Sequence, residues 1–221
     1  MNSESVTLQA HYLKADRIML GVIWFLVAYS FGVAAFHGTW AQALVIGGLT
    51  GVAVTALYML IPGQRLLRCL IGAAFMVFSA LHINQAHGML EMHFGIFALL
   101  AFLVYYRDWL PIVVAALTIA VHHLSFFALQ QQGTDVFLMP DGNWGEVFLH
   151  AFYVVLESAI LVYLAIRAAA EAREGEALLG AAAAITARPE RIDLSYRSRV
   201  SGPVTQRFNQ LLDQLGDLVG A

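Results

Sequence analysis

Histidine is the residue type in this chain that is best suited to do chemistry. Eight histidines are present, and six of them occur with two glutamates inside strongly apolar segments or at their edges. Ionisable groups in such surroundings are costly unless they are paired or bound to something. The candidate site residues are His82, His87, His93, His122, His123, His150, Glu91 and Glu157.

Metal binding is the chemistry that this set of residues favours. Imidazole is a common ligand of copper, iron and zinc, and carboxylate mixed with imidazole favours iron, manganese or zinc. Six histidines could hold two copper ions with three imidazoles each, and inclusion of a glutamate makes a di-iron site competitive. We therefore expect bound metal ions, copper or iron, in a dinuclear centre.

A b-type haem is an alternative cofactor, because it needs only two axial histidines. It would leave four of the six histidines without a role. Outside this group, we expect His11 and His37 to make ordinary polar contacts and Met89 and Met92 to pack. The histidines that could face a haem are His82, His93, His123 and His150.

The composition identifies the environment that surrounds these groups. Of the 221 residues, 60% are hydrophobic and only 12% are charged, whereas a soluble domain carries about 25% charged residues. The chain is therefore expected to be a membrane protein. Its single cysteine, Cys69, excludes an intramolecular disulfide framework and sites that need several thiolates. The sequence has no basic stripe outside the flanks of the apolar runs, so we do not expect a nucleic acid partner.

Six apolar runs would position the histidines. With about 20 residues needed to cross a bilayer, the sequence predicts an all-α integral membrane bundle of six transmembrane helices. On this topology every one of the 12 lysines and arginines lies on the side of the N-terminus, which predicts that both termini are cytoplasmic. The runs cover approximately 18–36, 41–61, 66–85, 90–106, 109–130 and 146–166.

The predicted topology also gives the depth of the histidines in the bilayer and the domain organisation of the chain. All six clustered histidines would lie in the outer half of the bilayer, on four different helices. We expect a polar, frayed cytoplasmic tail (1–16), a six-helix transmembrane domain (17–168) and cytoplasmic signal-transmitting helices (169–221). The sixth helix should continue past Arg167, because the composition there changes to Ala, Glu and Arg without a break until about 187–190.

A short heptad pattern follows near the C-terminus. Its apolar residues are spaced alternately by four and three, which is typical of the seam of a coiled coil. The pattern covers little more than two heptads, so a single amphipathic helix packed on something else is also possible. We favour the start of a parallel helical bundle in a homodimer. The seam residues are Val204, Phe208, Leu211, Leu215 and Leu218.

Three blocks of residues resemble a known family. They are similar to the multi-span sensory region found ahead of the signalling domains of bacterial methyl-accepting chemotaxis proteins, and of some other signalling outputs. The likeness covers roughly residues 15–168. The blocks are His82-xxxx-His87-Gly-Met-x-Glu91-Met-His93-Phe, Tyr106-Arg-Asp-Trp109-x-Pro-Ile-Val-Val-Ala-Ala and Val121-His-His-Leu124.

The tail from Arg191-Ile-Asp through Pro203-Val-xxx-Phe-Asn209-xx-Leu-Asp213 is similar to the segment that leads from such a region into the chemoreceptor coiled coil. The resemblance implies a receptor of the bacterial inner membrane that works with a downstream cytoplasmic signalling domain or kinase complex. The sequence ends at Ala221 without long methylation helices or a kinase-contacting hairpin. We expect a truncated receptor, with a free-standing sensor as the alternative.

Together these observations predict a membrane sensor of metal, oxygen or redox state that signals through its last helices. It is not expected to be an enzyme. A membrane metallo-oxidoreductase is the alternative, since the same centre could activate oxygen. A transporter is disfavoured because the inner halves of spans three to five are nearly all apolar.

Overall fold

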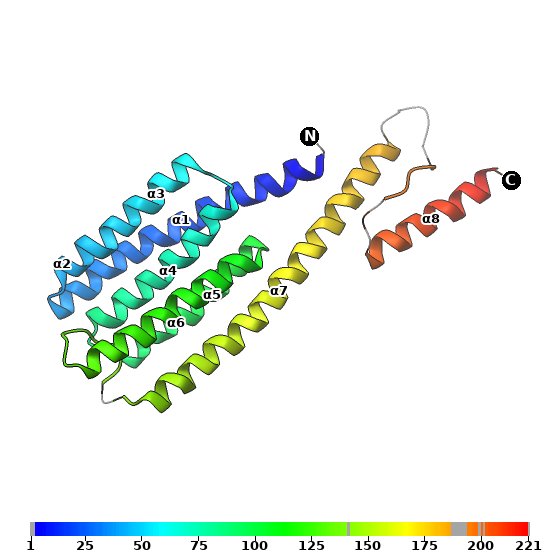
Figure 1. Cartoon of the computed structure of the whole chain (residues 1–221). Helices are drawn as coiled ribbons and strands as arrows, with labels where there is room; N and C mark the ends of the chain where they lie inside the picture. Colours follow the sequence, from blue (N-terminus) through cyan, green and yellow to red (C-terminus); the bar gives the residue numbers. More distant parts are fainter. Residues whose placement is uncertain (1–2, 141, 187–193, 199, 201, 221) are drawn as a thin grey trace. The chain divides into compact units, whose positions relative to one another are not determined.

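The computed structural model describes residues 3–140, 142–186, 194–198, 200 and 202–220. Helix is the regular secondary structure of these residues, so the all-α prediction is confirmed for them. The helices are α1 (Ser3–His37), α2 (Trp40–Gln42), α3 (Leu49–Leu60), α4 (Arg65–Gln85), α5 (Phe94–Leu103), α6 (Trp109–Gln131), α7 (Trp144–Ile185) and α8 (Pro203–Gly220) (Figure 1).

Shorter helical segments complete these elements. A π-helical segment, Ala43–Gly48, joins α2 to α3, so that Trp40–Leu60 is one continuous rod. The 3-10 turns Leu90–His93 and Val104–Tyr106 extend α5 at its two ends.

Five helices are long and apolar enough to cross a membrane: α1, the rod 40–60, α4, α6 and α7. This agrees with the membrane character predicted from composition. The helix over Leu90–Tyr106 is apolar but shorter. In α4, 67% of the most apolar stretch is buried inside the protein, compared with 22–39% in the other four. α4 is therefore the central helix of the bundle.

α4 packs most extensively against α6. The contact is close because Gly72 has no side chain, and a Cβ atom at this position would lie 2.7 Å from the carbonyl oxygen of Pro111. Large apolar side chains of α4, including Phe75 and Phe78, are fully buried. α4 and α6, which carry His82, His122 and His123, thus form the central pair of helices.

The chain divides into two compact units, residues 12–166 and residues 1–11 with 167–221. α1 begins at Ser3, so the expected frayed tail is helical instead. α7 runs without interruption from Trp144 to Ile185, which confirms the predicted continuation past Arg167. The predicted break at 187–190 lies outside the described residues.

In the second unit, α8 runs parallel to the last part of α7. The carboxylate of Glu174 on α7 accepts hydrogen bonds from the backbone N–H groups of Val204 and Thr205, at 2.7 and 2.8 Å. Further along both helices, Ile185 and Leu215 line one groove. Glu174 therefore caps the N-terminus of α8, where the helix dipole favours a negative charge.

Candidate functional site

Four of the six candidate histidines form one cluster, which we call the four-histidine cluster: His93, His122, His123 and His150. The ring centroids of His93 and His123 are 5.5 Å apart, and each of these rings lies 5.2 Å from the ring of His150. The ring of His122 lies 5.3 Å from that of His123. Three separate segments of the chain therefore bring their imidazoles into contact.

Local structure explains how each ring reaches the cluster. His93 ends the 3-10 turn before α5, and its Nδ1 lies 3.3 Å from the carbonyl oxygen of Met89. His123 is in α6, with its Nδ1 3.0 Å from the carbonyl oxygen of Ile119. Because a carbonyl oxygen can only accept, both Nδ1 atoms carry the proton and Nε2 is left with its lone pair. This arrangement is common for metal-binding histidines.

The Nε2 atoms of all four histidines are buried and have no hydrogen-bond partner among the described residues. Most buried polar atoms in proteins are hydrogen-bonded, so four such atoms in one cluster require an explanation. His93 and His123 are only 1% and 5% exposed, which keeps bulk water away from them. The Nε2 atoms of His93 and His123, whose Nδ1 atoms carry the proton, are thus buried acceptors that a bound cation would satisfy.

The spacing of the rings is compatible with ligands of one metal ion. With metal–nitrogen bonds of about 2.0–2.1 Å, imidazoles in tetrahedral coordination have ring centroids roughly 5 Å apart. The separations of 5.2–5.5 Å are similar. In their present orientations, no group of three or more His, Cys, Asp or Glu side chains among the described residues is arranged to hold a metal ion. Binding would therefore require the rings to turn.

The remaining two candidate histidines lie elsewhere. His82 is 5% exposed, and its Nε2 lies 2.9 Å from the hydroxyl oxygen of Ser30 on α1. His87 is exposed, and its ring contacts those of His37 and Phe137, with centroids 5.4 and 4.8 Å apart. Neither makes a ring contact with the four-histidine cluster.

The separation of His87 from the cluster comes from the end of α4. His87 has a φ of 53° and Gly88 a φ of 80°, both in the left-handed region, so the helix does not continue to Glu91. A Cβ atom at Gly88 would lie 2.9 Å from the backbone nitrogen of Met139, which explains why glycine fits here. The sharp turn directs the chain away before it re-enters the bundle at His93.

The two candidate glutamates also lie apart from the four rings. Glu91 is exposed and lines a cavity with His82. Glu157 is half-buried on α7, two turns beyond His150, and its Oε2 is buried without a hydrogen-bond partner among the described residues. A second, apolar cavity of about 420 Å³ lies between α6 and α7 and is lined by His123 and His150.

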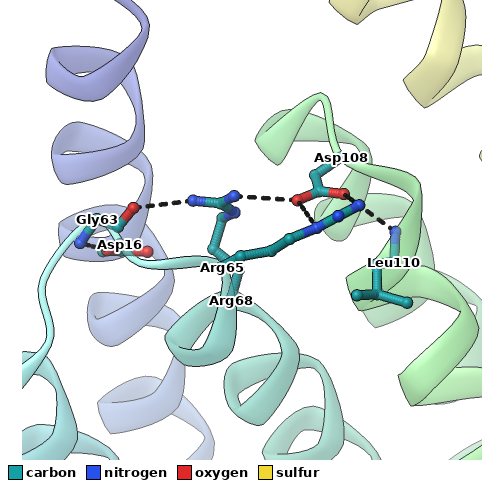
Figure 2. Close-up of polar contacts among 6 residues, drawn as sticks. All are labelled: Asp16, Gly63, Arg65, Arg68, Asp108 and Leu110. Carbon is teal, nitrogen blue, oxygen red and sulfur yellow. Dashed lines mark hydrogen bonds and ion pairs between the residues drawn. The ribbon is translucent and has the colours of Figure 1, made fainter. Parts of the chain in front are cut away.

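Charged side chains form a network at the end of the bundle opposite to the four-histidine cluster (Figure 2). The sequence did not predict this network. Asp108 accepts hydrogen bonds from Arg65, at 2.8 and 3.0 Å, and from Arg68, at 3.0 Å. Arg68 also donates to the carbonyl oxygen of Gly63, whose N–H donates to Asp16 at 2.6 Å. The network therefore links α1, α4 and the start of α6.

Asp108 is the centre of this network. It also caps α6 by accepting a hydrogen bond from the N–H of Leu110 at 3.2 Å. Burial alone would raise the pKa of Asp108, but the hydrogen bonds from Arg65 and Arg68 outweigh it and hold the pKa below its usual value. Asp108 thus remains a carboxylate at neutral pH and fixes both arginines.

No protein-family model matches this chain, and no curated protein or solved structure is significantly similar to it.

Proposed function

We propose that this chain is the membrane sensor module of a bacterial signal-transduction protein and that the four-histidine cluster is its metal centre. The observation that carries the proposal is the meeting of four buried Nε2 atoms without hydrogen-bond partners among the described residues. Such a set is costly in an apolar bundle unless a bound group uses it.

The proposed centre holds one copper or iron ion rather than two. Four imidazoles are enough for one ion, whereas the two-ion alternative would need His82 and His87, which lie in other surroundings. A haem is less suitable because the rings of His123 and His150 lie directly against each other, with centroids 5.2 Å apart. A porphyrin would have to separate α6 from α7.

The proposed topology has six spans, with Leu90–Tyr106 as the short fourth span and both termini in the cytoplasm. The distribution of lysine and arginine supports this orientation. It puts the network around Asp108 at the cytoplasmic face and the four-histidine cluster in the outer half of the bilayer. The centre would therefore meet a stimulus from the outer side or from within the lipid.

The proposed signal passes along α7, which carries both His150 and the Glu174 cap of α8. Most of the predicted seam on α8 is exposed in the single chain: Val204 is 54% exposed, Leu211 51% and Leu218 77%. A second copy would cover these side chains in a parallel bundle, as in a coiled coil. Movement of α7 on metal binding would then change the packing of the dimer.

Cross-linking between two copies tests this function. Leu218→Cys in a Cys69→Ala background places one thiol on the exposed seam of each copy. In native membranes, a bismaleimide joins the two thiols only when they lie close together. We expect the cross-linking rate to change several-fold between metal-loaded and chelator-treated membranes.

The same assay with His123→Ala and His150→Ala together should give a rate that no longer responds to metal. His37→Ala is the matched control, since His37 lies outside the cluster, and it should behave as the unmodified protein does. A rate that is unaffected by metal in the unmodified protein would refute the sensor proposal.

A further inference from the structure

The cavity that His82 and Glu91 line offers a binding site that the metal proposal does not use. It has a volume of about 490 Å³ and is formed by α1, α4 and the helix over Leu90–Tyr106. None of the four clustered histidines lines it. This volume is within the range of about 300–1,000 Å³ that is usual for small-molecule sites.

His82 is a buried polar group that lines this cavity. The hydroxyl of Ser30 donates its proton to the carbonyl oxygen of Leu26 at 2.9 Å, so its oxygen must accept from the Nε2–H of His82, also at 2.9 Å. A neutral imidazole that is protonated at Nε2 leaves Nδ1 as an acceptor. Nδ1 takes no part in that hydrogen bond, and His82, which lines the cavity, is only 5% exposed. A ligand that donates a hydrogen bond would therefore suit this nitrogen.

The other lining residues define the rest of the ligand. The ring of Tyr29 lies edge-on to that of His82, with centroids 4.8 Å apart, which gives the polar end an aromatic wall. Glu91 lines the same cavity, and its carboxylate would repel an anionic lipid headgroup. Toward the other end, Phe25 and Phe102 are 66% and 48% exposed, so the apolar part of the cavity opens on the surface that faces lipid.

We propose that this cavity binds a membrane hydroquinone, with its ring beside Tyr29, one hydroxyl donating to Nδ1 of His82, and its apolar tail leaving past Phe25 into the lipid. The oxidised quinone has carbonyl oxygens in place of the hydroxyls and cannot donate this hydrogen bond. The site thus distinguishes the reduced from the oxidised form by binding alone. It is independent of the four-histidine cluster and needs no metal.

Calorimetric titration of the metal-free full chain in lipid nanodiscs tests this inference. The probes are decylubiquinol, decylubiquinone and the dimethyl ether of decylubiquinol, under anaerobic conditions. A single buried hydrogen bond predicts that the quinol binds about tenfold more tightly than either of the other two. Equal affinity for all three probes would overturn the proposal and would indicate a groove for lipid tails.

Two variants and one control locate the site. His82→Phe should remove the preference for the quinol while weak binding of all three probes remains. Ala98→Phe, which fills the cavity from its lining, should weaken the binding of all three even if His82→Phe fails to fold. His37→Phe should bind like the unmodified protein. A preference for the quinol that persists in a folded His82→Phe variant would also overturn the proposal.

Discussion

The imidazole rings of His123 and His150 lie nearly parallel, with 6° between their planes and 5.2 Å between their centroids. They belong to α6 and α7, which are joined by the loop that follows Gln131. Because His93 contacts both rings, the three segments meet at one point. A cation bound here would hold three segments of the bundle together.

Metal binding should therefore stabilise the bundle. A ligand present at 100 times its Kd adds about 2.7 kcal/mol to the free energy of unfolding when it binds only the folded state. We expect copper or iron to raise the midpoint of thermal unfolding in detergent, measured by circular dichroism. His150→Ala should abolish the increase, and an equal increase in that variant would exclude His150 as a ligand.

Asp108→Asn should destabilise the protein strongly. The side chains of Asp108 and Arg68 are 7% and 6% exposed, and removing one partner of a buried ion pair costs about 3–5 kcal/mol. Titration with sodium dodecyl sulfate can measure the change in the free energy of unfolding. Asp213→Asn is the control, because the Arg197–Asp213 pair is largely exposed and such pairs contribute only about 0–1 kcal/mol. Equal effects of the two variants would show that the buried network does not support the fold.

The contribution of Asp108 should depend on pH. Its pKa is lower in the folded protein than its ordinary value of about 3.9, so the stabilisation is present above that value and is lost as the pH falls through the folded-state pKa. The difference in unfolding free energy between the unmodified protein and Asp108→Asn should be full above about pH 5 and shrink below about pH 4. A difference that stays constant down to pH 3 would contradict this assignment.

Gly72→Ala should separate α4 from α6. The added Cβ would lie 2.7 Å from the backbone oxygen of Pro111, which cannot rotate away, and overpacking typically costs about 1–3 kcal/mol. Gly32→Ala, which has nothing within 4 Å of its added Cβ, should change stability by less than about 1 kcal/mol. Similar denaturant midpoints for the two variants would show that the helices can adjust.

The helical fold follows from simple features of the sequence, because long apolar runs punctuated by Pro62-Gly63 and Arg107-Asp108 leave few alternatives. The extent of α1 was not foreseen. Its first residues are polar, and hydropathy alone does not distinguish a polar helical turn from a frayed tail. The length of α7 was foreseen, because no helix-breaking residue interrupts the Ala- and Glu-rich stretch after Arg167.

The site was only partly predictable. Spacing suggested that six histidines share one region, but it could not show that Ser30 on α1 engages His82 or that a left-handed turn at His87 redirects the chain. The distribution of lysine and arginine predicts membrane orientation, but it does not show that Arg65 and Arg68 pair with Asp108. An acidic residue such as Asp16 close to an apolar run should have prompted a search for its partner.

The metal content of the full chain, purified from cells grown with copper and iron, tests the central claim most directly. Elemental analysis should find one equivalent of one of these metals per chain, and X-ray absorption should show three or four imidazole nitrogens at about 2.0 Å. Purified protein without bound metal, which also fails to take up copper or iron on reconstitution, would contradict the assignment of the four-histidine cluster as a metal centre.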